Sequence, residues 1–202
     1  MEKDEIKKSN RITIVLVVLL FVSPLFLSWY VFNHTDFLEA RGTSNNGDLI
    51  VPVRPIGDLA LIDPYNNERN DSIYGKWNLV YVTDYCEKQC EENIYIIRQT
   101  HLSMDKHSLR VQKVLLLTEQ PIDQIKSLLT NYRGQQIINN ENINVHDVVE
   151  KFRLNKADNP LEANRLYIVD PLGNLMMSYE PGINPRNIYK DLKKLLRGSR
   201  IG

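Results

Sequence analysis

A long run of uncharged residues near the start of the chain sets the first limit on its fold. Residues 12–32 contain no charged side chain. At about 1.5 Å per residue, a helix of this length crosses a hydrocarbon core of about 30 Å. Trp29 and Tyr30 lie near the end of the run, where aromatic side chains favour the membrane–water boundary. The sequence therefore predicts a single transmembrane helix over residues 12–32.

The charges on either side of this run predict its orientation. Several lysines and one arginine lie within residues 1–11, and the next lysine or arginine after the run is Arg41. Positively charged flanks stay in the cytoplasm, so we expect residues 1–11 there and residues 33–202 on the other side. In a bacterium this describes an inner-membrane protein with a periplasmic domain. A cleaved signal peptide is the alternative, but the run is too long and no small-x-small cleavage site follows it.

The remaining chain divides into a tether and one domain. Residues 33–47 include a small, polar stretch from Arg41 to Gly47 with nothing to bury, which predicts a linker. Residues 48–202 are long enough for one domain with its own core. The 25 basic and 25 acidic residues balance, and no basic patch with interleaved aromatic residues occurs, so nucleic acid is not an expected partner.

The two cysteines of the chain follow a predicted strand and open a predicted helix. Residues 77–83 are apolar and β-prone, and the apolar residues after Cys90 recur at helical intervals. Backbone N–H groups and the helix dipole at such a helix start favour a thiolate. Residues four apart in a helix lie roughly 6 Å apart at Cα, so Cys86 and Cys90 could form a disulfide. Two thiolates could instead hold one soft metal ion.

A purely structural disulfide is the least favoured of these readings. A bridge that closes so short a loop removes little entropy from the unfolded chain, so it would stabilise the fold only weakly. In an oxidising compartment an idle pair would become a disulfide. We therefore expect a partner to keep the pair Cys86 and Cys90 reduced, or to cycle it.

The segments around this motif alternate between strand and helix patterns. The segments with strand patterns are residues 109–118, 165–170 and 175–179, the last two joined by a turn at 171–174. The segments with helix patterns are residues 121–132, 145–154 and 183–196. Before the motif, short apolar runs at 49–53 and 59–62 predict edge strands or a hairpin, and residues 66–71 predict a loop. This order predicts an α/β sandwich with a parallel strand pair and an antiparallel edge.

Several of these motifs occur in the order and spacing of the Sco/SenC family. They are Gly75-Lys76 before the apolar strand, Cys86-x3-Cys90, and the run Leu166–Gly173 around the last turn. The chain resembles this family over residues 75–197. The resemblance implies a thioredoxin-like fold on an N-terminal membrane anchor and a role in building the copper centre of cytochrome c oxidase. It also implies Cys86 and Cys90 as the site residues, copper as a cofactor, and an oxidase subunit or a copper donor protein as partner.

The chain departs from the family pattern at one metal ligand. The family carries a copper-binding histidine a few residues before the last hairpin, and the matching position here is near Glu162, within residues 159–164, which contain no histidine. A carboxylate is a hard ligand and suits Cu(I) poorly, so we expect Glu162 to be a surface residue, or else a nearby acid or base. The prolines that flank the family's cysteines are also replaced by charged and polar residues.

Other histidines and methionines do not readily replace the missing ligand. His101, Met104 and His107 form a row, but in a continuous helix His101 lies roughly 16 Å along the axis from Cys90. A metal–sulfur bond is about 2.3 Å long. These three residues are therefore too far away to bind a metal together with Cys86 and Cys90, and we expect them to lie at the end of a helix and in the loop after it. The sequence pattern does not place His146 relative to the cysteines, so His146 is not excluded as a metal ligand.

Three functions are consistent with these features. In the first, the protein is a Sco-like thiol–disulfide oxidoreductase in which Cys86 attacks and Cys90 resolves the mixed disulfide. In the second, it delivers Cu(I) held by the two cysteines alone. In the third, it is a non-catalytic assembly or scaffold factor that has kept the fold and lost the site.

Overall fold

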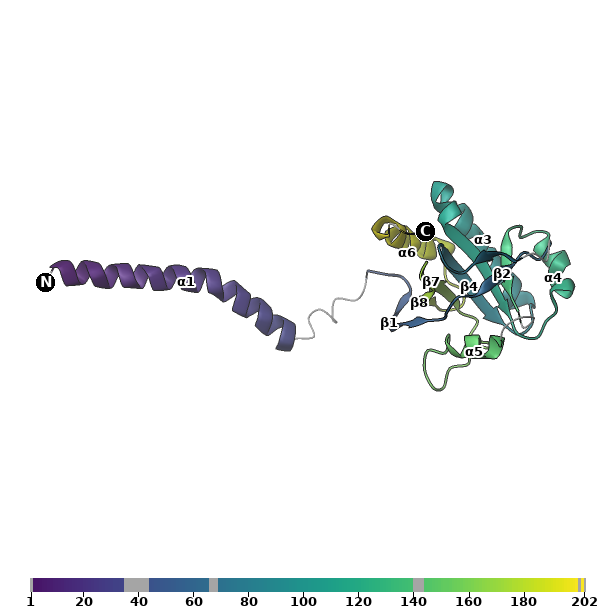
Figure 1. The fold of residues 1–202 in the computed structure, drawn as a ribbon, viewed down its shortest axis with the longest axis horizontal. Helices are drawn as coiled ribbons and strands as arrows, with labels where there is room; N and C mark the ends of the chain where they lie inside the picture. The colour runs from purple at the N-terminus through teal and green to yellow at the C-terminus, as the bar shows by residue number, and fades with distance from the viewer. Residues whose placement is uncertain (1, 35–43, 66–68, 140–143, 200, 202) are drawn as a thin grey trace. The chain divides into compact units, whose positions relative to one another are not determined.

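The computed structural model describes residues 2–34, 44–65, 69–139, 144–199 and 201 (Figure 1). They fall into two compact units that divide after Ser44. The first unit is the helix α1 (Glu2–His34), and its segment Ile12–Val31 is long and apolar enough to cross a membrane by length and composition. This unit is compatible with a single-pass membrane anchor. Most of the predicted tether, residues 35–43, lies outside the described residues.

The second unit is an α/β sandwich around one mixed sheet of eight strands, with thioredoxin-like topology at its centre. The strand order across the sheet is β1-β8-β7-β4-β5-β6-β2-β3. In chain order the elements are β1 (Asp48–Pro55), β2 (Ala60–Ile62), β3 (Arg69–Ser72), β4 (Trp77–Thr83), α3 (Lys88–Leu102), η1 (Asp105–Arg110), β5 (Val111–Leu117), α4 (Ile122–Leu129), β6 (Gln135–Ile138), α5 (Val145–Glu150), β7 (Leu166–Val169), β8 (Asn174–Tyr179) and α6 (Pro185–Gly198).

Strand β4 lies at the centre of the sheet and supplies both of its hydrophobic faces. All seven of its residues are buried. Because successive side chains of a strand point to opposite faces, Leu79 and Tyr81 pack with α3, α4 and α6, whereas Val80 and Val82 pack on the face that α5 covers. A strand buried on both sides needs a nearly continuous apolar sequence, and this explains why β4 was predictable.

The structure confirms the predicted pairings of the central strands. β4 runs parallel to β5 from Trp77 beside Val111 to Thr83 beside Leu117. β7 and β8 form the predicted antiparallel hairpin. At its turn, Gly173 has a φ of +77°, and a Cβ there would lie 2.4 Å from the ring of Tyr74. Glycine is therefore required at this position.

The predictions for the outer strands were partly wrong. The runs at 49–53 and 59–62 do not form a hairpin with each other, because β1 pairs with β8 and β2 pairs with β3 and β6. Part of the predicted loop at 66–71 is instead β3, which is polar and pairs along one side only. The strand β6 was missed because Gln135 and Gln136 interrupt the apolar pattern by which strands are recognised.

The beginning of the second unit is held by a buried carboxylate of α6. The backbone N–H groups of Asn46 and Gly47 donate to Oδ2 of Asp191 over 2.8 and 3.1 Å. The side-chain amide of Asn46 donates to Oδ1 of the same residue over 2.9 Å. The compact unit therefore includes these residues just before β1, at the end of the segment predicted as a linker.

Candidate functional site

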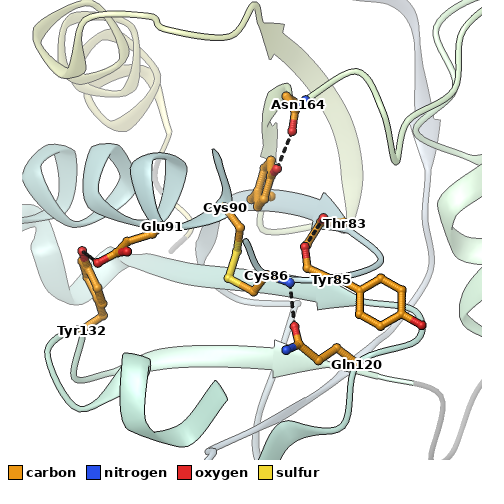
Figure 2. Close-up of a disulfide and its surroundings, with 9 residues drawn as sticks. Thr83, Tyr85, Cys86, Cys90, Glu91, Gln120, Tyr132 and Asn164 are labelled. Carbon is orange, nitrogen blue, oxygen red and sulfur yellow. Dashed lines mark hydrogen bonds between the residues drawn. A yellow bond between two sulfur atoms is a disulfide. The ribbon is translucent and has the colours of Figure 1, made fainter. Parts of the chain in front are cut away.

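Cys86 and Cys90 form a disulfide at the carboxyl end of β4 (Figure 2). Their Cα atoms are 4.9 Å apart. Cys86 lies in the segment that leaves β4, before the N-cap residue Glu87, and Cys90 lies in the first turn of α3. The prediction that the two sulfurs can join is confirmed. The helix begins near the cysteines as predicted, and α3 starts at Lys88, so only Cys90 lies within it.

The two sulfurs differ in their exposure. Cys90 is only 1 % exposed and belongs to the hydrophobic core between the sheet and α3. Cys86 is half-buried and packs against the edge of that core. Of the two residues, Cys86 is therefore the more accessible to a thiolate that arrives from solvent, while Cys90 is shielded in the core.

The segment that follows β5 fixes the backbone around Cys86. The N–H of Cys86 donates to Oε1 of Gln120 over 2.6 Å, and the N–H of Gln120 donates to the carbonyl of Asp84 over 3.1 Å (Figure 2). The hydroxyl of Thr118 donates to the carboxylate of Asp84. These bonds tie the two loops at the carboxyl ends of the neighbouring strands β4 and β5.

Sequence reasoning missed Gln120, although a usable signal was present. Gln120 follows the predicted second strand, and the carboxyl ends of neighbouring parallel strands meet at one edge of a sheet. This rule places some polar residue after β5 near the residues just after β4, where Cys86 lies, but it does not say that the residue is Gln120.

The loop before β7 closes the other side of the site. The hydroxyl of Tyr81 donates to Oδ1 of Asn164 over 2.7 Å, and the side-chain amide of Asn93, in α3, donates to the carbonyl of Asn164 over 3.4 Å. Asn164 has a φ of +51°, a conformation that asparagine tolerates better than most residues. Burial raises the pKa of Tyr81, so its hydroxyl stays protonated and remains a hydrogen-bond donor.

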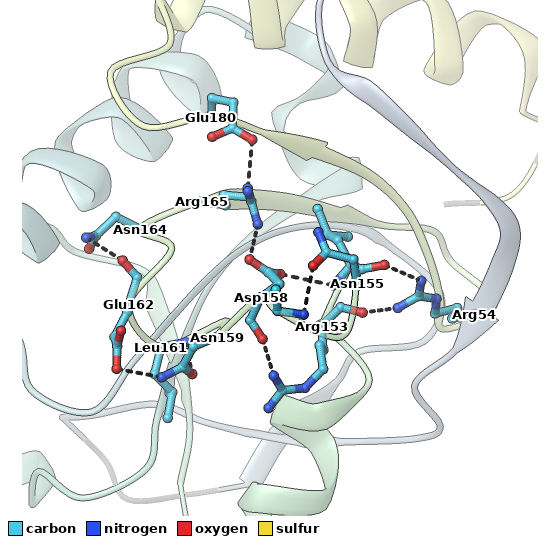
Figure 3. Close-up of polar contacts among 12 residues, drawn as sticks. Arg54, Arg153, Asn155, Asp158, Asn159, Leu161, Glu162, Asn164, Arg165 and Glu180 are labelled. Carbon is cyan, nitrogen blue, oxygen red and sulfur yellow. Dashed lines mark hydrogen bonds and ion pairs between the residues drawn. The ribbon is translucent and has the colours of Figure 1, made fainter.

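Glu162, at the position of the family's histidine, is an exposed residue of this loop. Its carboxylate accepts a hydrogen bond from the side-chain amide of Asn159 over 2.8 Å, and its carbonyl accepts one from Asn164 (Figure 3). The carboxylate is thus engaged within its own loop. This agrees with the expectation that Glu162 is a surface residue.

The other candidate ligands have structural roles or lie on the surface. Nε2 of His101 lies 3.1 Å from the carbonyl of Ser108 and 3.2 Å from that of Val111. Met104 is 2 % exposed. His146 is exposed, and its Nε2 lies 3.5 Å from the carboxylate of Glu119.

Over the described part of the chain, no three histidine, cysteine, aspartate or glutamate side chains gather closely enough to hold a metal ion. The donor set at the site therefore consists of two sulfurs, which are joined in a disulfide. The chemistry that this arrangement offers directly is thiol–disulfide exchange at an accessible sulfur backed by a buried one. The three-ligand copper site implied by the family resemblance does not fit the residues present.

Comparisons with known proteins agree with this fold. Residues 77–199 match the model of a family described as "Transmembrane-like, thioredoxin-like, C-terminal domain". No curated protein matches the sequence.

Three solved structures illustrate the likeness. Yeast Sco1 with copper bound is 15 % identical with a TM-score of 0.57, and the match covers 73 % of this chain and 95 % of that one. BsSco, described as a member of the Sco family of cytochrome c oxidase assembly proteins with a disulfide switch, is 13 % identical with a TM-score of 0.51, over 71 % and 94 %. A thiol:disulfide interchange protein from Bacteroides sp. is 15 % identical with a TM-score of 0.52, over 73 % and 91 %. At these identities the likeness establishes the fold.

Proposed function

The chain belongs to the family of transmembrane-like, thioredoxin-like C-terminal domains. From this premise, we propose that it is a membrane-anchored, Sco-like thiol–disulfide protein. We propose that it assists the assembly of the copper centre of cytochrome c oxidase. The observation that carries the proposal is the asymmetric disulfide, with Cys86 half-buried and Cys90 in the core. The Sco fold and the interchange-protein fold found among similar structures support it.

The proposed exchange runs through Cys86. A thiolate of the partner attacks Sγ of Cys86, the bond to Cys90 breaks, and Cys90 leaves as a thiolate that takes a proton from water. A second partner thiolate then attacks the partner's sulfur in the mixed disulfide and releases Cys86. Two electrons and two protons have passed from the partner dithiol to the cysteine pair, and the partner holds the new disulfide. In reverse, Cys86 attacks a partner disulfide and Cys90 resolves it.

The structural setting suits Cys86 for the attacking role. It lies just before the first turn of α3, where unpaired N–H groups and the helix dipole stabilise a thiolate. Its backbone N–H is held by Gln120, so the sulfur keeps a defined position. Cys90, buried one turn further on, is placed to act only on a bond already formed at Cys86.

We further propose that α1 anchors the domain in a bacterial inner membrane, with the N-terminus in the cytoplasm and the domain in the periplasm. The basic residues before Ile12 and the apolar length of Ile12–Val31 support this orientation. An oxidising compartment on that side would supply partners with cysteine pairs. The partner is an oxidase subunit or a copper donor protein.

Delivery of Cu(I) is the second candidate function, and the copper-bound Sco1 structure favours it. Copper would be the cargo, held by Cys86 and Cys90 after the disulfide is reduced, because two thiolates alone can bind Cu(I). Adding Cu(I) to the reduced full chain without oxygen tests this idea. Copper retained after passage over a chelating resin supports it, and a metal-free protein eliminates it.

A redox titration of the full chain in a non-ionic detergent tests the main proposal. We expect the disulfide to equilibrate with dithiothreitol at a potential above about −300 mV, because structural disulfides lie below that value. We also expect alkylation of the reduced protein to modify Cys86 before Cys90. Cys86→Ser should abolish exchange with a small disulfide, while Cys90→Ser should trap a mixed disulfide. Full exchange by the Cys86→Ser variant would refute the assignment of roles.

A cellular experiment separates the redox proposal from the scaffold alternative. In a strain that carries Cys86→Ser together with Cys90→Ser, we expect reduced oxidase activity with normal levels of the membrane-anchored protein. Normal oxidase levels in this strain would favour a scaffold that no longer uses its cysteines.

A further inference from the structure

A groove on the outer face of α3 begins beside the disulfide. It has a volume of about 460 Å³ and is lined by Lys88, Glu91, Glu92, Tyr95, Ile96 and Tyr132. Glu91 is the residue directly after Cys90, and Figure 2 shows the lining residues Glu91 and Tyr132 to one side of the disulfide. Ile96 packs against the core, and Tyr95 stands 52 % exposed at the groove. The groove thus presents apolar and aromatic surface to solvent.

Two carboxylates and one ammonium group line the groove, and the guanidinium of Arg98 is close enough to act on Tyr132. Glu91 and Glu92 are exposed lining residues, and Glu87, beside Cys86, is exposed as well. Lys88 is a single basic residue among those that line the groove. The hydroxyl of Tyr132 donates to Oε1 of Glu91 over 3.5 Å. This long bond leaves most of the hydrogen-bonding capacity of the Glu91 carboxylate open to a ligand.

We infer, resting on the proposed thiol–disulfide function, that this groove binds the segment of the partner protein next to its reactive cysteine. The partner cysteine would meet Cys86, the accessible sulfur, and its chain would run over the first turns of α3. A large apolar side chain of the partner would pack on Tyr95 and Ile96. A lysine or arginine of the partner would face Glu91 and Glu92, since unlike charges attract across such a surface.

The geometry of α3 also sets the spacing of this partner motif. The sulfur of Cys86 is bonded to that of Cys90, so Cys90 marks the position of the reacting sulfurs along the helix. Tyr95 follows Cys90 by five positions, which corresponds to about 7.5 Å along the helix axis. An extended chain covers about 3.3 Å per residue. The apolar residue of the partner therefore lies two to four positions from its cysteine, and the basic residue lies between them or next to them.

Small thiols of different charge test the electrostatic part of the inference. The full chain, in a non-ionic detergent at low salt, is reduced with cysteamine, 2-mercaptoethanol or 3-mercaptopropionate, and each rate is divided by the rate of the same thiol with a neutral disulfide that none of them forms, such as diethyl disulfide. We expect the normalised rate with cationic cysteamine to exceed that with anionic 3-mercaptopropionate by about fivefold, and the ratio to shrink in about 1 M salt.

Charge-neutralising variants assign this preference to the groove. The double variant Glu91→Gln/Glu92→Gln keeps an acceptor for Tyr132 and should lose most of the cysteamine preference. The matched control Asp48→Asn/Asp63→Asn removes two charges from β1 and from the end of β2, several strands away from β4. This control should keep the preference. Equal normalised rates for all three thiols, or the same loss in both double variants, would overturn the inference.

Two cysteine peptides test the apolar part. One carries arginine beside the cysteine and leucine three positions away, and the other carries glutamate and serine there. We expect the first to reduce the disulfide several-fold faster, and Tyr95→Ala to remove the part of this advantage that leucine supplies. If dithiothreitol reduces the disulfide but peptides and small thiols show no preference, the inference fails and the thiol–disulfide function stands. If no thiol reduces the disulfide, the proposed function itself fails.

Discussion

The clearest test of the fold concerns the buried carboxylate of Asp191 in α6, whose side chain is 0 % exposed. Oδ2 accepts the backbone N–H groups of Asn46 and Gly47 and, over 3.2 Å, the hydroxyl of Tyr179. Oδ1 accepts the side-chain amide of Asn46. One carboxylate therefore satisfies several donors at the point where the domain begins. Lys194 lies 3.7 Å away as a more distant counter-charge.

The cost of removing this carboxylate follows from the donors that it leaves. In Asp191→Ala, the backbone N–H groups of Asn46 and Gly47 lose their acceptor, and the hydroxyl of Tyr179 keeps only the weak acceptor Sδ of Met177, 3.0 Å away. Each buried donor left without an acceptor costs about 1–3 kcal/mol. We expect a loss of about 4 kcal/mol in the free energy of unfolding. Asp191→Asn keeps one oxygen for the backbone donors but loses the charge, so we expect about 2 kcal/mol. For a domain of this size, the two losses lower Tm by roughly 8–16 °C and 4–8 °C.

Denaturant unfolding of the full chain in a non-ionic detergent, followed by near-ultraviolet circular dichroism, measures these losses. Asp123→Asn is the control, because its carboxylate is 84 % exposed and forms an ion pair with Lys126 at the surface. Its effect should stay within about 0.5 kcal/mol. An Asp191→Ala variant as stable as this control would show that the hydrogen bonds to Asp191 do not hold the start of the domain.

Two further variants probe packing and the effect of pH. Gly47→Ala would place a Cβ 2.5 Å from the ring of Tyr179, so we expect the free energy of unfolding, measured with denaturant, to fall by about 1–3 kcal/mol. The control Gly198→Ala has open space around the new Cβ and should leave stability unchanged or slightly raised. Equal effects of the two variants would contradict the packing argument. Burial, and secondarily the charge of Lys113, lowers the pKa of His101 below its usual 6.5. Its contribution to stability is therefore complete above pH 6.5 and is lost as the pH falls from there through the folded-state pKa, so His101→Gln should show a shallower decline in stability between pH 7.5 and 5.5 than the unchanged chain.

The predictable part of the fold is the part in which local sequence and tertiary environment agree. β4 is apolar throughout because both faces of the sheet are covered there. The turn between β7 and β8 was recognisable from Asp170 and Gly173, and the carboxylate of Asp170 accepts the N–H groups of Leu172 and Asn174 there. In such segments the local preference of each residue agrees with the structure that the whole fold requires of it.

The unpredicted part depends on partners that are distant in the chain. β3 consists of Arg69–Ser72, has no apolar alternation, and is a strand only because β2 lies beside it. Likewise, the sequence predicted the reach between Cys86 and Cys90 but not the acceptor Gln120, because that contact depends on how two loops meet at the sheet edge. The groove beside α3 was also hidden, since Tyr132 arrives from a separate segment after α4.

The placement of β1, β2 and β3 also determines the order in which the protein can fold. All three precede the residues that match the family model, yet β1 forms one border of the sheet and the pair β2 and β3 forms the other. β1 pairs with β8, which is made near the end of synthesis. β1, the first of these strands to leave the ribosome, must therefore wait for nearly the whole chain before it finds its neighbour β8, whereas β2 and β3 can pair with each other at once and need only β6 to join the sheet. Distant pairings such as that of β1 slow folding. Until β8 is made, β1 has no partner in the sheet, and an unpaired strand of this kind is a site at which chains aggregate.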